Sequence, residues 1–249
     1  MKFIKIEQLN DYKIVKLNRP EVKNAFHPDM IAEITEIFQQ LNNEKNIKAV
    51  ILSGEGSVFC AGADLHWMKE MVKYNLEENL NDSAKLWNMF EAVRVCERPI
   101  LGVLQGAVYG GALGLVACCD YVFAEEKTQF CFSEVKLGLA PAVISSFLLK
   151  KIPDAFIRPL MLSAEVFNTE KAKSIGLVHT VFNGFFDFEN SIKAFNQNGL
   201  QAMCETKKLL NQLPTASWDQ QKTKTTQVIS ERRVSAEGQN FLQKFIQKK

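Results

Sequence analysis

Two apolar stretches each lead through a glycine-rich turn into a helical segment, and this repeated junction constrains the fold most. The first runs from "IKAVILSG" through "EGSVFCAGAD" to "LHWM", and the second runs from "ILGVLQGAVYGG" to "ALGL". Short continuous apolar runs are typical of strands buried on both faces, which occur in parallel sheets covered by helices. The two junctions therefore predict an α/β protein with a largely parallel sheet.

The segments around these junctions extend the same pattern. Residues 3–18 predict two short strands about the Asn10-Asp11 turn, and apolar side chains recur at helical spacing within residues 27–45. Residues 121–134 predict two more short strands, whereas the chain from Pro141 onward has an almost wholly helical pattern. We expect an α/β core over residues 1–190 and a helical assembly region over residues 191–249.

Composition excludes several classes of protein. The net charge is +2, from 30 basic and 28 acidic residues, so no overall field favours nucleic acid or an acidic membrane surface. No apolar run reaches the ~18–20 residues of a transmembrane helix, and "MKFIKI" alternates like a strand rather than a signal peptide. The six cysteines and three histidines lack metal-ligand spacing, which predicts a cytoplasmic protein with reduced thiols and no metal.

The two glycine-rich junctions are also candidate anion sites. The start of a helix presents free backbone N–H groups and the positive end of the helix dipole. Two such junctions could direct two N–H donors at one oxygen atom, which is the arrangement of an oxyanion hole. Alternatively, the glycines only permit tight turns and close packing. The pattern alone leaves both interpretations open.

Glu134 is the main candidate for acid–base chemistry. It lies in "FCFSEVKLG", and a carboxyl group held among apolar residues would have a raised pKa, as general acid–base catalysis at neutral pH requires. Alternatively, Glu134 is an ordinary glutamate at a helix start, with Ser133 as the cap. We interpret Asp120, which follows "VACC", as a buried carboxylate that closes the preceding helix.

Taken together, these stretches resemble the crotonase, or enoyl-CoA hydratase/isomerase, superfamily. The resemblance follows the blocks "KLNRPEVKNAF", "GSVFCAGADLHWM", "PILGVLQGAVYGGALGLVACCD" and "FSEVKLGLAPAVIS", and it continues to the C-terminal helix. Within the superfamily, the chain looks most like the methylglutaconyl-CoA hydratase-type members. The resemblance implies a spiral of ββα units with C-terminal helices that build homotrimers, commonly paired into hexamers.

The resemblance also implies site residues. The backbone N–H groups of Ala63 and Gly111 match the oxyanion hole that binds the thioester oxygen of an acyl-CoA. Coenzyme A then enters as part of the substrate rather than as a permanently bound cofactor. The residues that match its binding site are Ala25, Ala61 and Leu65, together with Phe245 and Lys248 from a neighbouring subunit, although Phe241 and Lys244 have the same spacing. Side chains that either line the acyl pocket or pack ordinarily are His66, Trp67, Tyr109 and Phe132.

The chain departs from the superfamily at one catalytic position. Typical hydratases hold the reacting water between two glutamates; the second matches Glu134, but the first matches Gly114. Three interpretations remain. The first is a hydratase of a short or branched 2-enoyl-CoA that uses Glu134 alone, which we prefer because of the likeness around "SEVKLGLAPAVIS". The second is a Δ3-Δ2-enoyl-CoA isomerase, and the third is a non-enzymatic or RNA-associated protein of this fold.

Overall fold

The chain is divided into two compact units in a computed structural model that describes residues 2–247. The core unit runs to Cys96 and resumes from Ile100 to Phe186. The C-terminal unit consists of Glu97–Pro99 and the chain from Asp187 onward. The candidate catalytic residues Ala63, Gly111 and Glu134 all lie in the core unit.

The core unit contains a six-stranded sheet with strand order β1-β2-β3-β4-β6-β9. β1 and β2 form an antiparallel hairpin, and every other neighbouring pair in this sheet is parallel, as the apolar runs predict. A smaller three-stranded sheet has the order β5-β7-β8. The strands are β1 (Ile4–Leu9), β2 (Tyr12–Leu17), β3 (Ala49–Gly54), β4 (Ile100–Leu104), β5 (Ala107–Tyr109), β6 (Tyr121–Glu125), β7 (Gln129–Cys131), β8 (Phe167–Asn168) and β9 (Thr180–Phe182).

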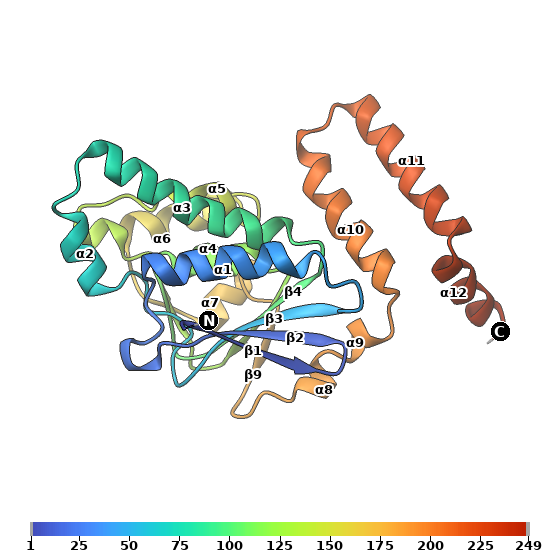
Figure 1. Ribbon diagram of the computed structural model, residues 1–249, viewed down its shortest axis with the longest axis horizontal. Helices are drawn as coiled ribbons and strands as arrows, with labels where there is room; N and C mark the ends of the chain where they lie inside the picture. The colour runs from blue at the N-terminus through green and yellow to red at the C-terminus, as the bar shows by residue number, and fades with distance from the viewer. Residues whose placement is uncertain (1, 248–249) are drawn as a thin grey trace. The chain divides into compact units, whose positions relative to one another are not determined.

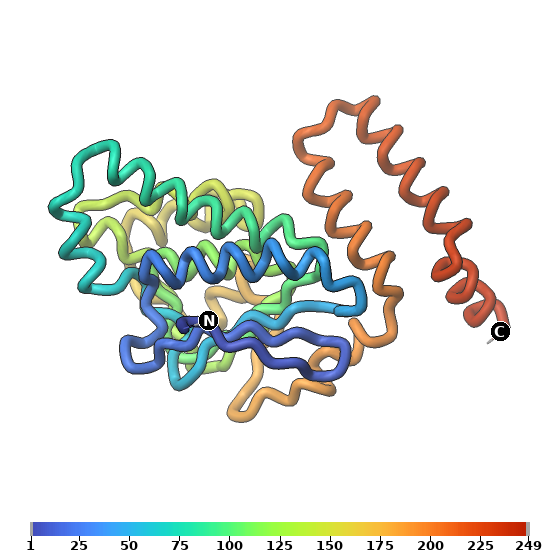
Figure 2. Tube along the Cα trace, in the orientation of Figure 1, coloured from blue at the N-terminus to red at the C-terminus, as the bar shows by residue number. Residues whose placement is uncertain are grey.

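Helices pack against one another over the six-stranded sheet (Figure 1). The trace in Figure 2 shows α3 running back alongside α1, and α3 also contacts α4 and α5. Six fully or nearly buried apolar residues of α1 face this core at the spacing that the sequence predicts. The core-unit helices are α1 (Pro28–Leu41), α2 (Leu65–Met71), α3 (Leu76–Val95), α4 (Ala112–Cys118), α5 (Ala142–Leu148), α6 (Asp154–Ser163) and α7 (Thr169–Ser174).

The structure refines one expectation about the core unit and corrects another. The chain after Pro141 is almost wholly helical, as expected, but two short strands that the sequence did not predict, β8 and β9, complete the edges of the two sheets. Strands of two or three residues are too short to show a periodic pattern. Asp120 is exposed rather than buried, although its Oδ2 accepts a 2.7 Å hydrogen bond from the backbone N–H of Ile100 and so joins the end of α4 to β4.

The C-terminal unit is helical, as the sequence predicts. Glu237 at the start of α12 accepts backbone hydrogen bonds from Gln201 and Ala202 and so caps α10. Lys207 Nζ donates a 3.0 Å hydrogen bond to the carbonyl oxygen of Arg98, which anchors α10 to the short segment Glu97–Pro99. The helices are α8 (Phe188–Ser191), α9 (Lys193–Asn196), α10 (Leu200–Gln212), α11 (Trp218–Val234) and α12 (Ala236–Gln247).

Candidate active site

The first glycine junction orients the backbone N–H of Ala63. The backbone N–H of Phe26 donates to the carbonyl oxygen of Gly62 at 2.7 Å, and the N–H of Asp64 donates to the carbonyl oxygen of Phe26 at 2.9 Å. In a trans peptide the N–H points opposite to the C=O, and no cis peptide occurs among the described residues. The N–H of Ala63 therefore points away from Phe26. Ala63 is itself exposed.

The second junction orients the backbone N–H of Gly111 in the same manner. Gly110 has a φ of +52°, and its carbonyl oxygen accepts a 3.0 Å hydrogen bond from the N–H of Leu113 in the first turn of α4. The N–H of Gly111 therefore points away from the body of that helix. Within residues 2–247, no hydrogen bond occupies the N–H of either Ala63 or Gly111. Both groups are available to a ligand oxygen.

Backbone pairing brings the two junctions together. Cys60 donates to the carbonyl oxygen of Ala107 and accepts from the N–H of Tyr109, each at 3.1 Å, so the segment before Ala63 lies along β5. A side chain at Gly62, where φ is +99°, would begin 3.1 Å from the carbonyl oxygen of Tyr109. Glycine is required there because the two turns approach backbone to backbone.

Glu134 lies beside the second junction. It begins a short 3-10 helix after β7, and a Cβ on Gly110 would lie 3.5 Å from its Oε1 atom. Burial raises the pKa of Glu134. Its buried Oε2 atom has no hydrogen-bond partner among the described residues, and Ser133 makes no side-chain cap at this helix start. A half-buried carboxyl beside Gly110, with one shielded oxygen that has no partner among the described residues, has the properties of a general acid–base.

Apolar side chains fill the space beside Gly114. A Cβ on this buried glycine would lie 2.6 Å from Cζ of Phe90 and 2.8 Å from Cγ2 of Ile144. The Phe90 ring is fully buried and packs edge-on against Phe147, with ring centroids 5.4 Å apart. α3 and α5 therefore occupy the space that a larger side chain at this position, which the resemblance matches to the first glutamate of typical hydratases, would need.

The structure spreads the remaining predicted residues over different environments. Leu65 and His66 are exposed at the start of α2, whereas Trp67 is buried in the core. Phe132 is fully buried and stacks on Phe167, and Tyr109 is half-buried at the end of β5. The predicted coenzyme A contacts comprise Ala25, which is buried, Ala61, which is half-buried, Phe245, which is exposed on α12, and Lys248, which lies outside the described residues.

Sequence reasoning missed the polar residues that hold the first junction. The Arg19 guanidinium donates to the carbonyl oxygen of Ala25 and to Oδ2 of Asp64, each at 2.7 Å. Asn24, which is fully buried with a φ of +54°, donates to the carbonyl oxygens of Glu55 and Val58. No local signal marked these residues, because Arg19 and Asn24 stand among other polar and charged residues in "KLNRPEVKNAF".

These observations define a class of protein: an α/β fold in which two unpaired N–H groups lie on adjacent turns beside a half-buried carboxyl. The family model for enoyl-CoA hydratase/isomerase matches residues 10–248. The chain belongs to this family.

Known proteins agree with this assignment. A crystal structure of an enoyl-CoA hydratase from Shewanella pealeana superposes with a TM-score of 0.90 at 32% identity, covering 99% of this chain and 94% of that one. An enoyl-CoA hydratase of Alternaria alternata is 31% identical over 71% of this chain and 57% of its own length. The mitochondrial Delta(3,5)-Delta(2,4)-dienoyl-CoA isomerase of Mus musculus is 29% identical over 68% of this chain and 54% of its own length. The chain thus matches less than two thirds of the length of these curated relatives.

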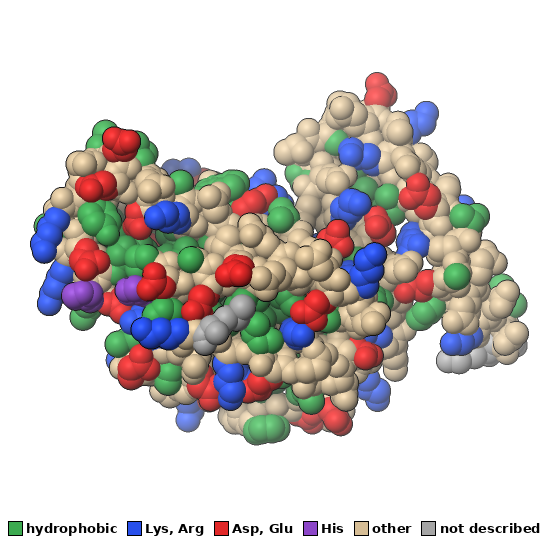
Figure 3. Space-filling view, in the orientation of Figure 1, with side chains coloured by type: hydrophobic (Ala, Val, Ile, Leu, Met, Phe, Trp, Pro, Cys, Tyr) green, Lys and Arg blue, Asp and Glu red, His purple; other side chains and the backbone are tan. Residues whose placement is uncertain are grey.

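Other kinds of site find no support in the described part of the chain. Residues 2–247 contain no group of three or more His, Cys, Asp or Glu side chains that could hold a metal ion. No helix in the same range is long and apolar enough to cross a membrane. On the face shown in Figure 3, acidic and basic side chains are interspersed.

Proposed function

We propose that this protein is a hydratase, and in reverse a dehydratase, of a short or branched 2-enoyl-CoA such as a methylglutaconyl-CoA-like thioester. The observation that carries the proposal is the Glu134 carboxyl beside Gly110, the residue before Gly111, with its buried Oε2 atom unpaired among the described residues. The crystallised relative from Shewanella pealeana, which is described as an enoyl-CoA hydratase, supports the reaction class. The coenzyme A part of the substrate would contact the backbone near Ala25 and Ala61.

The proposed mechanism places the thioester oxygen between the N–H groups of Ala63 and Gly111. Charge develops on this oxygen as water adds to C3, and fixed N–H donors stabilise it more in the transition state than in the ground state. Protonated Glu134 gives its proton to C2 and recovers a proton from the water whose hydroxyl bonds to C3. One water is consumed and Glu134 is regenerated, so a single carboxyl completes the cycle.

A specific observation favours a second candidate, a Δ3-Δ2-enoyl-CoA isomerase. Phe90 and Ile144 make the space beside Gly114 apolar, so no second carboxylate holds a water there. An isomerase needs no water, because one carboxyl removes a proton from C2 of the 3-enoyl thioester to form the enolate and returns it at C4. The Mus musculus relative is described as an isomerase that moves double bonds.

Incubation with crotonyl-CoA, 3-methylglutaconyl-CoA and a 3-enoyl-CoA, followed by mass spectrometry, separates the candidates. We expect a gain of one water from a 2-enoyl-CoA, and loss of that activity in Glu134→Gln with acyl-CoA binding retained. Glu126→Gln, an exposed glutamate of the turn after β6, is the matched control. A double-bond shift without mass change would replace the hydratase proposal with the isomerase. No reaction with any thioester, together with measurable RNA binding, would favour the non-enzymatic alternative.

A further inference from the structure

Arg19 connects the two chain segments that frame the first glycine junction. One guanidinium nitrogen donates to the carbonyl oxygen of Ala25 and another donates to Oδ2 of Asp64, each at 2.7 Å. The Arg19 and Asp64 side chains are only 12% and 9% exposed, so solvent screens this ion pair little. The planar fork of arginine suits two acceptors at fixed positions, which a lysine ammonium would not satisfy in the same geometry.

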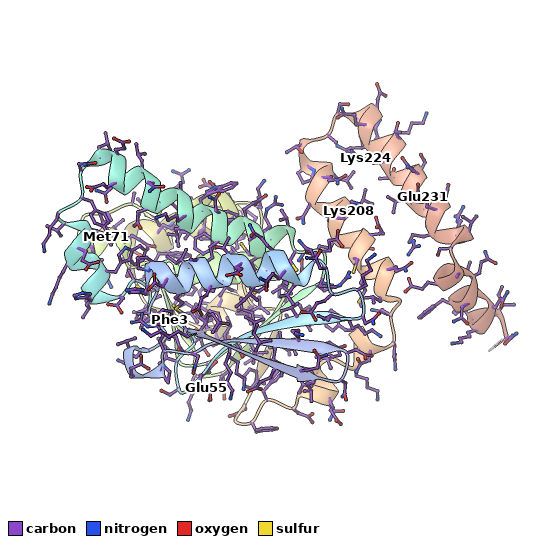
Figure 4. The ribbon with its side chains drawn as sticks, in the orientation of Figure 1. Phe3, Glu55, Met71, Lys208, Lys224 and Glu231 are labelled. Carbon is purple, nitrogen blue, oxygen red and sulfur yellow. The ribbon has the colours of Figure 1, made fainter. Side chains whose placement is uncertain are left out.

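The surroundings of Arg19 hold both its backbone and its side chain. Its backbone N–H donates to Oδ1 of Asn24 at 2.8 Å, and the Asn24 side chain in turn bonds the carbonyl oxygens of Glu55 and Val58. The guanidinium also lies over the ring of Phe3, 5.4 Å from its centroid. Phe3, below the Arg19 guanidinium, and Glu55, whose carbonyl oxygen Asn24 bonds, can be located by their labels in Figure 4. Both the backbone and the side chain of Arg19 are thus held by several contacts within the core unit.

Asp64 transmits this constraint to the neighbouring peptide. Its Oδ1 accepts a 2.7 Å hydrogen bond from the N–H of His66, which caps α2, and its own N–H donates to Phe26. Burial alone would raise the pKa of Asp64, but the hydrogen bond and charge of Arg19, together with the backbone N–H groups of His66 and Trp67, outweigh burial and lower it. Asp64 is therefore an anchored carboxylate, and it directly follows Ala63. With Gly62 anchored on the other side, the peptide carrying the Ala63 N–H has both ends fixed.

We propose that Arg19 is a positioning residue that fixes the direction of the Ala63 N–H through Asp64. The inference rests on the proposed role of this N–H as an oxyanion donor. A donor that binds charge developing in the transition state affects kcat more than KM. Loss of a donor outright typically costs ~10²–10³ in kcat, so its misorientation should cost about tenfold or more.

The test compares Arg19→Gln and Arg19→Lys with Arg158→Gln. Arg158 is a matched control, because it pairs with Asp154 at the same 2.7 Å but is exposed on α6. One readout is the red shift of bound cinnamoyl-CoA, whose conjugated carbonyl is polarised by oxyanion donors. The other is the separate change in kcat and KM on whichever of the three thioesters above the wild type converts. We expect both Arg19 variants to reduce the red shift and to lower kcat about tenfold or more with KM nearly unchanged, and Arg158→Gln to match the wild type.

Two outcomes are kept distinct. If wild-type protein binds cinnamoyl-CoA without a red shift, the proposed oxyanion hole itself fails. If the wild type shows the shift and folded Arg19 variants keep both the full shift and wild-type kcat, the positioning role of Arg19 is overturned. Should the Arg19 variants fail to fold, Asp64→Asn decides the matter. This variant keeps an acceptor for the N–H of His66 but removes the charge that holds Arg19, and we expect the same loss of shift and kcat.

Discussion

The ionised Glu134 carboxyl destabilises the folded protein, because burial removes water that would stabilise its charge. Its pKa is raised from the ordinary value of 4.5, which the unfolded chain retains. Between these two pKa values the folded protein keeps a proton that the unfolded chain has lost. The free energy of unfolding therefore falls as pH rises through this window, and the penalty persists above it.

Glu134→Gln should consequently raise stability at neutral pH while it abolishes turnover. Glutamine cannot ionise, so in the variant this position does not lower the free energy of unfolding as pH rises. We expect the difference in melting temperature between Glu134→Gln and the wild type to grow from pH 4 to pH 8 in calorimetric scans. Glu126→Gln reports the effect of removing an exposed glutamate. A difference in melting temperature that does not change with pH would contradict the buried-carboxyl interpretation.

Gly114 presents the opposite case, since its missing side chain is what the packing requires. Alanine would gain about 1 kcal/mol in helix propensity, but inserting a methyl group into a filled core costs ~1–3 kcal/mol. The Phe90 ring is fully buried and confined by Phe147, so it cannot easily move away. We expect Gly114→Ala to lower the free energy of unfolding measured by urea denaturation.

Shortening the Phe90 side chain should offset part of the stability lost in Gly114→Ala. Phe90→Leu alone leaves a cavity and destabilises the protein. In the double variant the new methyl group occupies part of that cavity, so the two losses should be less than additive. A Gly114→Ala protein more stable than the wild type would show that α3 and α5 can move apart. Space for a second carboxylate would then exist after all.

At the scale of elements, the sequence predicts what is encoded locally. Continuous apolar runs predict the parallel strands, the 3.6-residue spacing predicts α1, and glycine clusters predict the two turns that present unpaired N–H groups. The sequence singled out Glu134 as the acid–base candidate but left open an ordinary glutamate at a helix start, so its surroundings became visible only in the structure. Each of these signals lies within about twenty residues of chain.

Contacts between distant segments could not be predicted in this way. Arg19 and Asp64 are 45 positions apart, and nothing in either local pattern indicates that they pair. The same holds for Phe90 and Gly114, which meet only because α3 packs on α4. β8 and β9 depend on neighbouring strands for their hydrogen bonds, since two- and three-residue strands have no independent stability. The fold class is thus local information, whereas the rigidity of the site is tertiary.

At the scale of the whole molecule, the last helix carries an apolar stripe that demands a partner. Phe241, Leu242 and Ile246 are 42–68% exposed and lie at positions i, i+1 and i+5 of α12, which places them on one side of the helix. Exposed contiguous apolar side chains of this kind mark interaction surfaces. A second copy of the chain would bury them in a homo-oligomer, the assembly that the family resemblance predicts.

We therefore expect light scattering at micromolar concentration to give three or six times the 28.2 kDa chain mass. Burying one leucine or isoleucine side chain is worth ~1.5–3 kcal/mol, and a carboxylate in its place adds a desolvation cost. Leu242→Asp or Ile246→Asp should therefore dissociate the assembly into single chains. Gln243→Asp introduces the same charge at an exposed polar position between them and should leave the mass unchanged. A wild-type protein with the mass of one chain would contradict the prediction, because the stripe would then be stable in water.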